Sequence, residues 1–512
     1  MSELVEIKVS PDNINDETII RAKLKKHRKS SAKMGEYILR RKSLDSRQRN
    51  IFYLMRFEVY DQGEIPVSHH ETVYQNIHNK PSVIIIGAGP AGYFAALKLI
   101  ARGIKPIVLD RGKDVRARRR DLRAIQQDGE VNEHSNYCFG EGGAGTYSDG
   151  KLYTRSQKRG NIIGILNTLH DHGAPDDILF DAHPHIGSNK LPKIVSNIRE
   201  TILKHGGEVH FEHFVTDLII NNDKIEGCET EDGQRFYSKA VILATGHSAR
   251  DIFELLHNKG IKLEAKDFAL GVRIEHPQSL IDALQYRQDP RHPELPAASY
   301  RLTTQVNNKG VFSFCMCPGG LIVPAATHPG ELVVNGMSLS RRDSPYSNSG
   351  FVTAVDKEDF KDFEELGIFA GLEYQKHFEQ VMWQHGDGSQ KAPAQLVQDF
   401  LKGRLSENLL DTSYIPGIYS ARMDQLLPAP IVERLRAGLR AFGKRYPSYI
   451  GPKAQIIGIE SRTSSPIRFP RNKDGQHVGI EGLYPCGEGA GYAGGILSAC
   501  MDGEKIANKI KI

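Results

Sequence analysis

The stretch VIIIGAGPAG, residues 83–92, joins a short apolar run to three closely spaced glycines, and the helix-like pattern YFAALKL follows at residues 93–99. This order predicts a buried strand, a tight turn and a helix. Gly87 permits the sharp turn, Gly89 lets backbone amides approach a pyrophosphate, and Gly92 lets the helix pack closely on the strand. The stretch therefore predicts a dinucleotide site in a doubly wound α/β fold.

Three later segments show which dinucleotide binds. Asp110 ends a second apolar run, where an acid accepts the hydroxyls of an adenosine ribose. The strand-like run VILATG, residues 241–246, lets the chain pass close to the bound nucleotide. Glu488 stands among glycines before another helix pattern, and it suits a polyhydroxylated linker that needs an acceptor. FAD has such a ribityl chain and NAD does not, so FAD is the predicted cofactor.

The chain resembles a largely uncharacterised bacterial family of FAD-dependent dehydrogenases within the glutathione-reductase-like class. Five motifs carry the resemblance, in the family's order: GEGGAGTYSDGKL at 140–152, ATGHSARD at 244–251, GVRIEHP at 271–277, FCMCPGG at 314–320 and ESRTSSPIR at 460–468. The similarity extends over about residues 36 to 512. It implies that the glycine loops, the acid after the second strand and the C-terminal Gly-Glu segment line the FAD, and it does not supply the substrate.

From the motifs and the resemblance together we expect a set of cofactor-binding residues that is scattered over 400 positions. The set is Gly87, Gly89, Pro90, Ala91, Gly92, Asp110, Arg111, Arg118, Gly143, Thr146, Ala244, Thr245, Gly246, Gly487, Glu488, Gly494, Gly495 and Ile496. Arg118 matches a family position after the second strand, whereas the neighbouring arginines are expected to lie on a solvent-exposed helix face. A purely structural role for Arg118 stays open.

Residues for the chemistry itself are harder to assign, because flavin accepts hydride and the protein supplies position and electrostatics. The loop at residues 140–150 has the composition of an anion-binding nest, and Lys151 follows it. Arg462 and Ser464 lie where a cation and a hydroxyl could face the pyrimidine edge of a flavin. Lys151, Arg462 and Ser464 are the catalytic candidates, with a structural loop and a surface turn as the alternative interpretations.

Other polar residues favour structural roles. Arg273 and His276 fall on opposite faces of one predicted strand, so they do not share a pocket unless the strand bends, and His276 reads as a structural histidine. Cys315 and Cys317 share a predicted strand face, but their C-x-C spacing fits neither a zinc site nor a reductase disulfide. No metal is expected. Hydrolase and nucleotide-triphosphatase motifs are absent from the sequence.

Composition describes a globular chain without a membrane span. The 512 residues are 25% charged and 39% hydrophobic, and six cysteines without a disulfide framework favour a reducing cytoplasm. The formal charge of +5 is too small to imply nucleic-acid binding by the whole chain. Residues 21–56 hold 13 Lys or Arg against 2 acids. A basic helix that buries Ile20 and Leu24 explains this run better than a grip on a phosphate backbone.

These observations predict four segments of chain: a small N-terminal α/β unit at 1–80, the first part of a Rossmann-like FAD-binding domain at 81–260, a mixed α/β cap at 261–450, and the rest of the FAD-binding domain at 451–512. The predicted function is hydride transfer between a small-molecule substrate and FAD. A flavin monooxygenase, an RNA-modifying flavoprotein and a flavin-binding sensor stay open. NADH or NADPH is expected to dock only transiently, because no second nucleotide motif is found. The substrate and the oligomeric state stay open.

Overall fold

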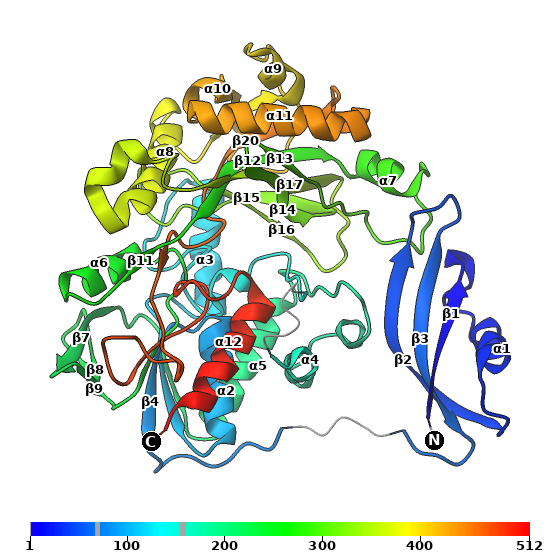
Figure 1. Cartoon of the computed structure of the whole chain (residues 1–512), viewed down its shortest axis with the longest axis horizontal. Coiled ribbons are helices and arrows are strands. Elements are labelled where there is room, and N and C mark those ends of the chain that lie inside the picture. The colour runs from blue at the N-terminus through cyan, green and yellow to red at the C-terminus, as the bar shows by residue number, and fades with distance from the viewer. Residues whose placement is uncertain (1, 67–71, 154–159, 512) are drawn as a thin grey trace.

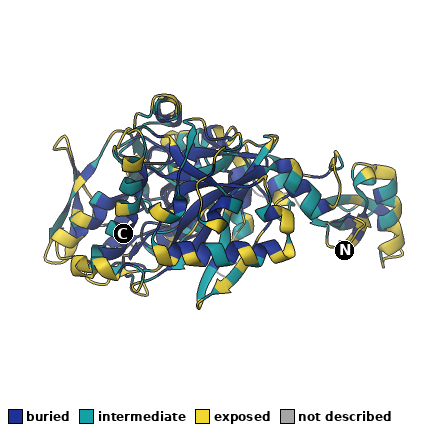
Figure 2. Ribbon diagram, turned by 90° about the horizontal axis from the view of Figure 1, so that it is seen from above, coloured by how far each residue is buried: buried dark blue, intermediate teal, exposed yellow. Residues whose placement is uncertain are grey.

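The computed structural model describes residues 2–66, 72–153 and 160–511. Its fold is mixed α/β, as predicted, with a parallel sheet, a larger antiparallel-rich sheet above it and a small N-terminal unit at one side (Figure 1). Buried residues follow the two large sheets through the main body (Figure 2). No helix in the described residues is both long and apolar enough to span a bilayer.

The parallel sheet has five strands in the order β22-β10-β4-β5-β6. Its strands come from segments far apart in the sequence: β4 (Ser82–Ile86), β5 (Lys105–Leu109), β6 (Glu208–His210), β10 (Val241–Leu243) and β22 (Leu483–Pro485). One core gathers the apolar residues of this sheet and of the helices packed on it, which are α2 (Pro90–Ala101), α4 (Ile162–Asp171), α5 (Leu191–Lys204) and α12 (Ile496–Lys509). Folding therefore brings together the carboxyl ends of β4, β5, β10 and β22, where the predicted motifs lie.

A second core covers the opposite side of the parallel sheet. It includes a meander of the predicted kind, with turns at residues 221–224 and 231–234, and a helix: β7 (Val215–Asn221), β8 (Lys224–Thr230), β9 (Arg235–Tyr237) and α6 (Arg250–Asn258). Helix α3 (Val115–Gln127) begins at Asp114, whose side chain accepts hydrogen bonds from Arg116 N and Ala117 N. The described Gly140 loop holds only one 3-10 turn, η2 (Gly143–Gly145).

The large sheet has seven strands in the order β13-β14-β17-β12-β20-β18-β19. They are β12 (Phe268–Pro277), β13 (Thr303–Val306), β14 (Lys309–Cys317), β17 (Tyr346–Val355), β18 (Ala392–Leu396), β19 (Ile418–Ser420) and β20 (Gln455–Glu460). The accompanying elements are α7 (Gln278–Tyr286), α8 (Ala370–His385), α9 (Val397–Lys402), α10 (Met423–Leu426), α11 (Ala429–Arg445), the 3-10 helices η5 (Lys361–Phe369) and η6 (Pro447–Ile450), the hairpin β15 (Gly320–Pro324) and β16 (Val334–Ser338), and the paired strands β11 (Glu264–Ala265) and β21 (Ile467–Arg468).

Two features of the large sheet correct the sequence interpretation. Strand β20 pairs with β12 and β18, so the segment that we expected to rejoin the FAD-binding domain at 451 first adds a strand to the large sheet. Strands β18 and β19 also belong to this sheet, although no strand pattern in the sequence indicated them. Both are short and fully or half buried, so alternation of polar and apolar residues does not reveal them.

The N-terminal unit has the predicted α/β character. Its elements are β1 (Glu3–Val9), the 3-10 turn η1 (Pro11–Asn13), α1 (Glu17–His27), β2 (Met34–Asp45) and β3 (Phe52–Asp61), with sheet order β1-β3-β2. Asp16 caps α1 by accepting from Ile19 N, and Ile20 and Leu24 are buried as expected. The unit docks on the body through backbone hydrogen bonds of Lys42 with residues 180 and 182. The η4 turn (Asp176–Leu179) precedes that contact.

Candidate functional site

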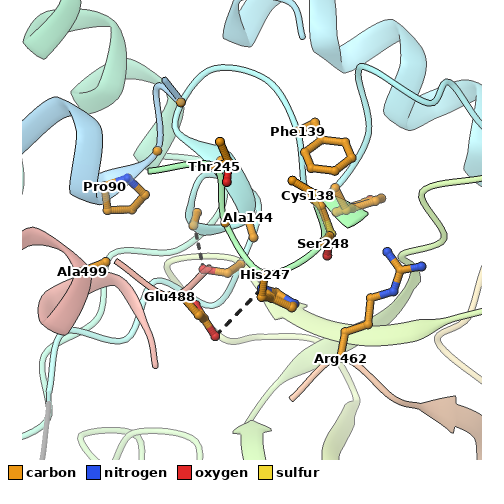
Figure 3. A pocket seen from close by; sticks show the side chains of 18 of the residues that line it. Pro90, Cys138, Phe139, Ala144, Thr245, His247, Ser248, Arg462, Glu488 and Ala499 are labelled. Atoms are coloured by element: carbon orange, nitrogen blue, oxygen red, sulfur yellow. Dashed lines mark hydrogen bonds and ion pairs between the residues drawn. The ribbon is translucent and has the colours of Figure 1, made fainter. Parts of the chain in front are cut away.

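A long cavity lies between the carboxyl edge of the parallel sheet and the lower face of the large sheet (Figure 3). It is lined at one end by the turns after β4 and β5, and at the other by residues of β14, β16 and β20. Of the predicted cofactor-binding residues it brings together Gly87, Gly89, Pro90, Ala91, Asp110, Arg111, Gly143, Ala244, Thr245, Gly246, Glu488, Gly494, Gly495 and Ile496. One cavity thus collects motifs that are separated by 400 residues.

The glycines at the start of the cavity have the geometry that the turn requires. Gly87 has φ +109°, and a Cβ built on it would overlap the carbonyl oxygen of Ala244. A Cβ on Gly92 would overlap the carbonyl oxygen of Gly87, so this glycine sets the close contact of helix and strand without lining the cavity. Gly89 is the N-cap of α2, whose first turn lines the cavity. Backbone amides and the positive end of the helix dipole therefore face the place where a pyrophosphate would lie.

Asp110 and Arg111 form the end of the cavity beyond that turn. Asp110 is buried, and its two oxygens accept hydrogen bonds from Ala88 N (2.8 Å) and Gly112 N (2.9 Å). Each oxygen keeps a lone pair that could accept from a ribose hydroxyl. The Arg111 guanidinium lies over the rings of Phe139 and Phe214, 4.5 and 4.2 Å from their centroids. This stacked group gives the nucleotide end an apolar and cationic wall.

Arg118 is part of the scaffold of this end rather than of its wall. It is fully buried, and it donates to the carbonyl oxygens of Asn136, Gly140, Glu141 and Gly143. These bonds use all three nitrogens of the guanidinium and hold the glycine loop in place. The expected nucleotide contact is replaced by a structural role, the alternative that the sequence left open.

Glu488 lines the cavity and points toward His247 (Figure 3). Its carboxylate is 3.9 Å from His247 Nδ1, and no hydrogen bond to it is found within the described chain. Burial raises the pKa of Glu488 to about 7, against the opposing effect of Lys266. Burial and the nearby Arg462 lower the pKa of His247 to about 4, so this imidazole is neutral at pH 7. A carboxylate without a protein donor suits the hydroxyl groups of a ribityl chain.

Arg462 lines the cavity, but its donors are used by buried acids. It donates to Glu379 (2.8 Å) and Glu331 (2.9 Å), and to Thr327 Oγ1. Arg250 completes the cluster by pairing with the same two carboxylates. Burial works against ionisation of Glu379, yet the two guanidinium groups hold the pKa of that carboxyl well below its usual range. We therefore interpret Arg462 as a structural cation rather than a ligand of the flavin.

The far end of the cavity is a chamber lined by Lys151, Phe314, Cys315, Asn335 and Glu460. Lys151 donates to the carbonyl oxygen of Met316 and lies 3.7 Å from Asp149. Burial opposes its charge, but Asp149 acts together with the thiols of Cys315 and Cys317 and with Tyr153, and the net effect raises the pKa of Lys151.

Arg273 lies behind the chamber wall and ties its parts together. Its fully buried guanidinium pairs with Glu460 at 2.6 Å and donates to the carbonyl oxygen of Cys315 at 3.0 Å. Gly336 makes room for it, since a Cβ there would overlap the guanidinium. His276 lies on the other side of β12, where its Nε2 is 2.8 Å from the carbonyl oxygen of Tyr449. The predicted separation of Arg273 and His276 is thus confirmed.

Cys315 corrects one expectation. The pairing of β14 with β17 shifts between Phe314 and Cys317, and Cys315 has φ +43°. Because of this bulge the two cysteines do not share a face: Cys315 is exposed in the cavity, whereas Cys317 is buried beside Arg273. The protein around the Cys315 thiol still raises its pKa to about 11 by burial.

Some of the predicted residues fall outside the cavity wall, and other wall residues were missed. Outside the wall are Gly92, Arg118, Thr146, Ser464 and Gly487; the Thr146 hydroxyl, for example, donates to Glu141 O inside the glycine loop. Missed wall residues include Phe139, Phe214, His247, Cys315, Asn335 and Glu460. Glu460 opens the ESRTSSPIR motif, and its position there was the only sequence signal for it.

The cavity fits FAD on three structural grounds. Two long helices, α2 and α12, begin at its wall. Glu488 offers an acceptor without a protein donor, and Asp110 keeps acceptor capacity at the stacked end. The helix N-termini suit the anionic diphosphate of FAD, Glu488 suits its polyhydroxylated ribityl linker, and Asp110 suits its ribose.

Comparisons with known proteins agree with this geometry. A family model described as "FAD-dependent protein, C-terminal domain-like" matches residues 267–463, and a domain of unknown function, DUF8436, matches residues 1–60. An uncharacterized protein of Clostridium beijerinckii is 44% identical over 435 residues, which cover 84% of this chain and 81% of that protein. The chain belongs to the family of this protein. Its cofactor is FAD.

More distant similarities are also found. The tRNA uridine 5-carboxymethylaminomethyl modification enzyme MnmG of Syntrophotalea carbinolica is 27% identical over 176 residues, which are 34% of this chain and 25% of that enzyme. Among solved structures, CtdE in complex with FAD has a TM-score of 0.34 at 10% identity, with 84% of each chain covered. Glycine oxidase from Bacillus cereus has a TM-score of 0.30 at 12% identity, with 84% of this chain and 94% of that chain covered.

Proposed function

We propose that the protein is a dehydrogenase of the glutathione-reductase-like class that transfers hydride from a small-molecule substrate to FAD. The observation that carries the proposal is the chamber, which places a carboxylate beside the cavity at the end away from the nucleotide motifs. Bound FAD supplies the two-electron acceptor. The chain's own residues must hold the substrate, exclude water and take up a proton.

Glu460 is the residue with the geometry to take that proton. One of its oxygens is held by Arg273 at 2.6 Å, and the side chain lines the cavity. Burial raises the pKa of Glu460, with Arg273 acting in the opposite direction. As a carbon–hydrogen bond of the substrate delivers its hydride, the proton of a neighbouring O–H or N–H group would pass to Glu460, and a double bond would form between the two substrate atoms.

Anaerobic bleaching of the purified protein tests this function. Fractionated small metabolites would be added without oxygen, and we expect one fraction to reduce the flavin rapidly and saturably. Glu460→Gln should keep its FAD and bleach at least about tenfold more slowly, within the range for loss of a general base. Incorporation of oxygen into the substrate on aeration would show a monooxygenase instead.

Electrons from a nicotinamide are expected to enter only by transient contact. The described residues form one parallel sheet with one strand–glycine–helix unit of the dinucleotide type. NADH and NADPH alone should therefore reduce the flavin slowly and without saturation below millimolar concentration. Fast, saturable reduction in a stopped-flow experiment would reclassify the protein as an NADPH-dependent reductase.

An RNA-modifying flavoprotein is the second candidate, because part of the chain is similar to the tRNA modification enzyme MnmG and α1 exposes Lys25 and Lys26. Several basic side chains of the N-terminal unit are already paired, among them Arg40 with Glu58 and Arg56 with Glu6. Binding of transfer RNA that weakens steeply with salt would favour this function. The absence of such binding would leave the dehydrogenase.

A further inference from the structure

The described charged groups around the chamber include one more positive charge than negative charges. Three cations meet there: Lys151, Arg273 and Arg342. Two carboxylates face them. Glu460 pairs with Arg273, and Asp149 accepts from Arg342 at 2.6 Å. Lys151 shares Asp149 with Arg342 and lies 3.7 Å from it, beyond hydrogen-bond length. Within the described residues, the hydrogen-bond acceptor found for its ammonium is the carbonyl oxygen of Met316.

The neutral side chains of the chamber offer a ligand hydrogen-bond donors rather than acceptors. Asn335 accepts from Gly336 N at 2.7 Å and from Arg273 at 3.4 Å with its side-chain oxygen. No partner for its amide nitrogen is found among the residues that the structure describes, so that N–H group is what Asn335 can offer a ligand. Lys151 and Asn335 lie on the same wall of the chamber. Arg273 donates hydrogen bonds to the Asn335 side chain and to the carbonyl oxygen of Cys315. Lys151 donates to the carbonyl oxygen of the next residue, Met316.

We propose that the chamber binds the carboxylate group of a small monoanionic substrate, with Lys151 as its ion-pair partner and the Asn335 amide as a second donor. A single surplus charge matches a monoanion better than a doubly charged phosphate ester. The inference rests on the proposed function, since the ligand is the substrate whose hydride is transferred. It narrows the substrate to a small acid that carries a hydroxyl or amino group, with Glu460 left to accept the proton of that group.

Cys315 provides a reporter inside the chamber that does not depend on knowing the substrate. Among the described cysteines it is the one with an exposed side chain, and it interacts with Lys151, Glu460 and Arg273. Iodoacetate and iodoacetamide both alkylate a thiolate with loss of iodide, and they differ in one negative charge. The ratio of their rates at Cys315 cancels the thiolate fraction and measures how the chamber receives a carboxylate.

The experiment uses the FAD-loaded full-length protein and peptide mapping to follow Cys315 alone. The rate ratio of iodoacetate to iodoacetamide is divided by the same ratio for N-acetylcysteinamide. We expect a normalised ratio about tenfold above one, as a nearby unit charge in a partly enclosed site would give. Lys151→Met should bring the ratio close to one, and Lys151→Arg should retain it. Lys193→Met, which removes the same charge from an exposed position on α5, should leave the ratio unchanged.

Each other outcome overturns the proposal. A wild-type ratio near one, or a raised ratio that survives Lys151→Met, would show that Lys151 does not receive an anion. Alkylation that appears only after FAD is removed would show that the cofactor fills the chamber. No alkylation in either form would show a chamber closed to small anions. The proposed function can fail separately. If Cys315 reacts preferentially with iodoacetate but no metabolite reduces the flavin, the anion site stands and the dehydrogenase assignment is wrong.

Discussion

The two ends of the cavity differ in what builds them. The nucleotide end is made of backbone: glycine turns, helix N-termini and one carboxylate held by backbone amides. The chamber end is made of side chains from β14, β16, β20 and the Gly140 loop, which meet only after folding. A site made of backbone appears in the sequence as a contiguous motif, whereas a side-chain cluster leaves no comparable pattern. The comparison predicts that substitutions at the two ends fail in different ways.

The largest effect is expected at Gly87, where the backbone leaves no room for a side chain. In Gly87→Val the new Cβ would overlap Ala244 O at a φ of +109°, so strain and overlap add. We expect loss of FAD retention by more than about 100-fold, or failure to fold. Bound FAD per chain and far-ultraviolet circular dichroism measure the two outcomes.

Gly246→Ala is the matched control. Gly246 belongs to another cofactor motif and also has positive φ (+76°), but a Cβ there would meet nothing within 4 Å. It should cost about 1 kcal/mol through backbone strain alone. Equal damage by both substitutions would mean that positive φ, rather than close approach, determines the nucleotide end.

Arg462→Met should lower stability more than it alters chemistry. The substitution leaves Glu331 and Glu379 buried with one fewer cation, and removal of one partner from a buried pair costs about 3 to 5 kcal/mol. The apparent melting temperature should fall clearly. Arg468→Met in the same motif breaks only a half-exposed pair with Glu264 and should change it little, since such pairs contribute at most about 1 kcal/mol. A stable Arg462→Met protein that cannot be reduced would restore Arg462 as a catalytic residue.

How far the sequence predicts the molecule can be judged from these residues. The glycine turns, Asp110, Glu488 and the split parallel sheet follow from local patterns, because each needs only a few neighbouring residues. We predicted that Arg118 and Arg462 contact the cofactor because a sequence shows which residues are charged but not which groups they pair with in the fold. Glu460 was missed for the same reason, as Arg273 lies 187 residues away. The turn of Cys315 into the cavity depends on a bulge that period-two alternation does not include.

Glu488→Ala is expected to have a moderate effect. The substitution leaves ribityl hydroxyls without their acceptor, and FAD affinity should fall by about 1 to 3 kcal/mol, or about 5- to 150-fold. Equilibrium dialysis of the FAD-stripped and reloaded protein measures it. Unchanged affinity would show that the ribityl chain of FAD does not contact Glu488.

The affinity for FAD should also depend on pH through Glu488. Its pKa of about 7 is raised above the ordinary 4.5, so its contribution to folding stability is lost as pH rises from about 4.5 through 7, where the buried group ionises. Hydroxyl donors of FAD favour the ionised form, so affinity should rise several-fold between pH 6 and pH 8. His247, whose pKa is about 4, stays neutral in this range. Glu488→Gln should flatten the profile, and a profile that keeps its slope would place the titrating group elsewhere.

The smallest effect on FAD is expected from removing the N-terminal unit, because no described residue before Ile86 lines the cavity. The truncation must end before Ile77, because this residue belongs to the main body. Its side chain is fully buried in the core of the parallel sheet, and its N–H donates to His205 O at 2.9 Å. A chain that begins at Thr72 therefore keeps the segment around Ile77, whereas a cut at residue 80, the predicted boundary of the N-terminal unit, would remove this buried side chain. The truncation exposes Leu295 and the Glu294 carbonyl that accepts from Tyr53, so solubility should suffer before FAD binding does. FAD per chain and its dissociation constant should match the full-length protein within about twofold in the soluble fraction. Loss of FAD from a folded chain 72–512 would mean that docking of the unit orders the cavity, and the backbone-built end would then depend on a contact far from its motifs.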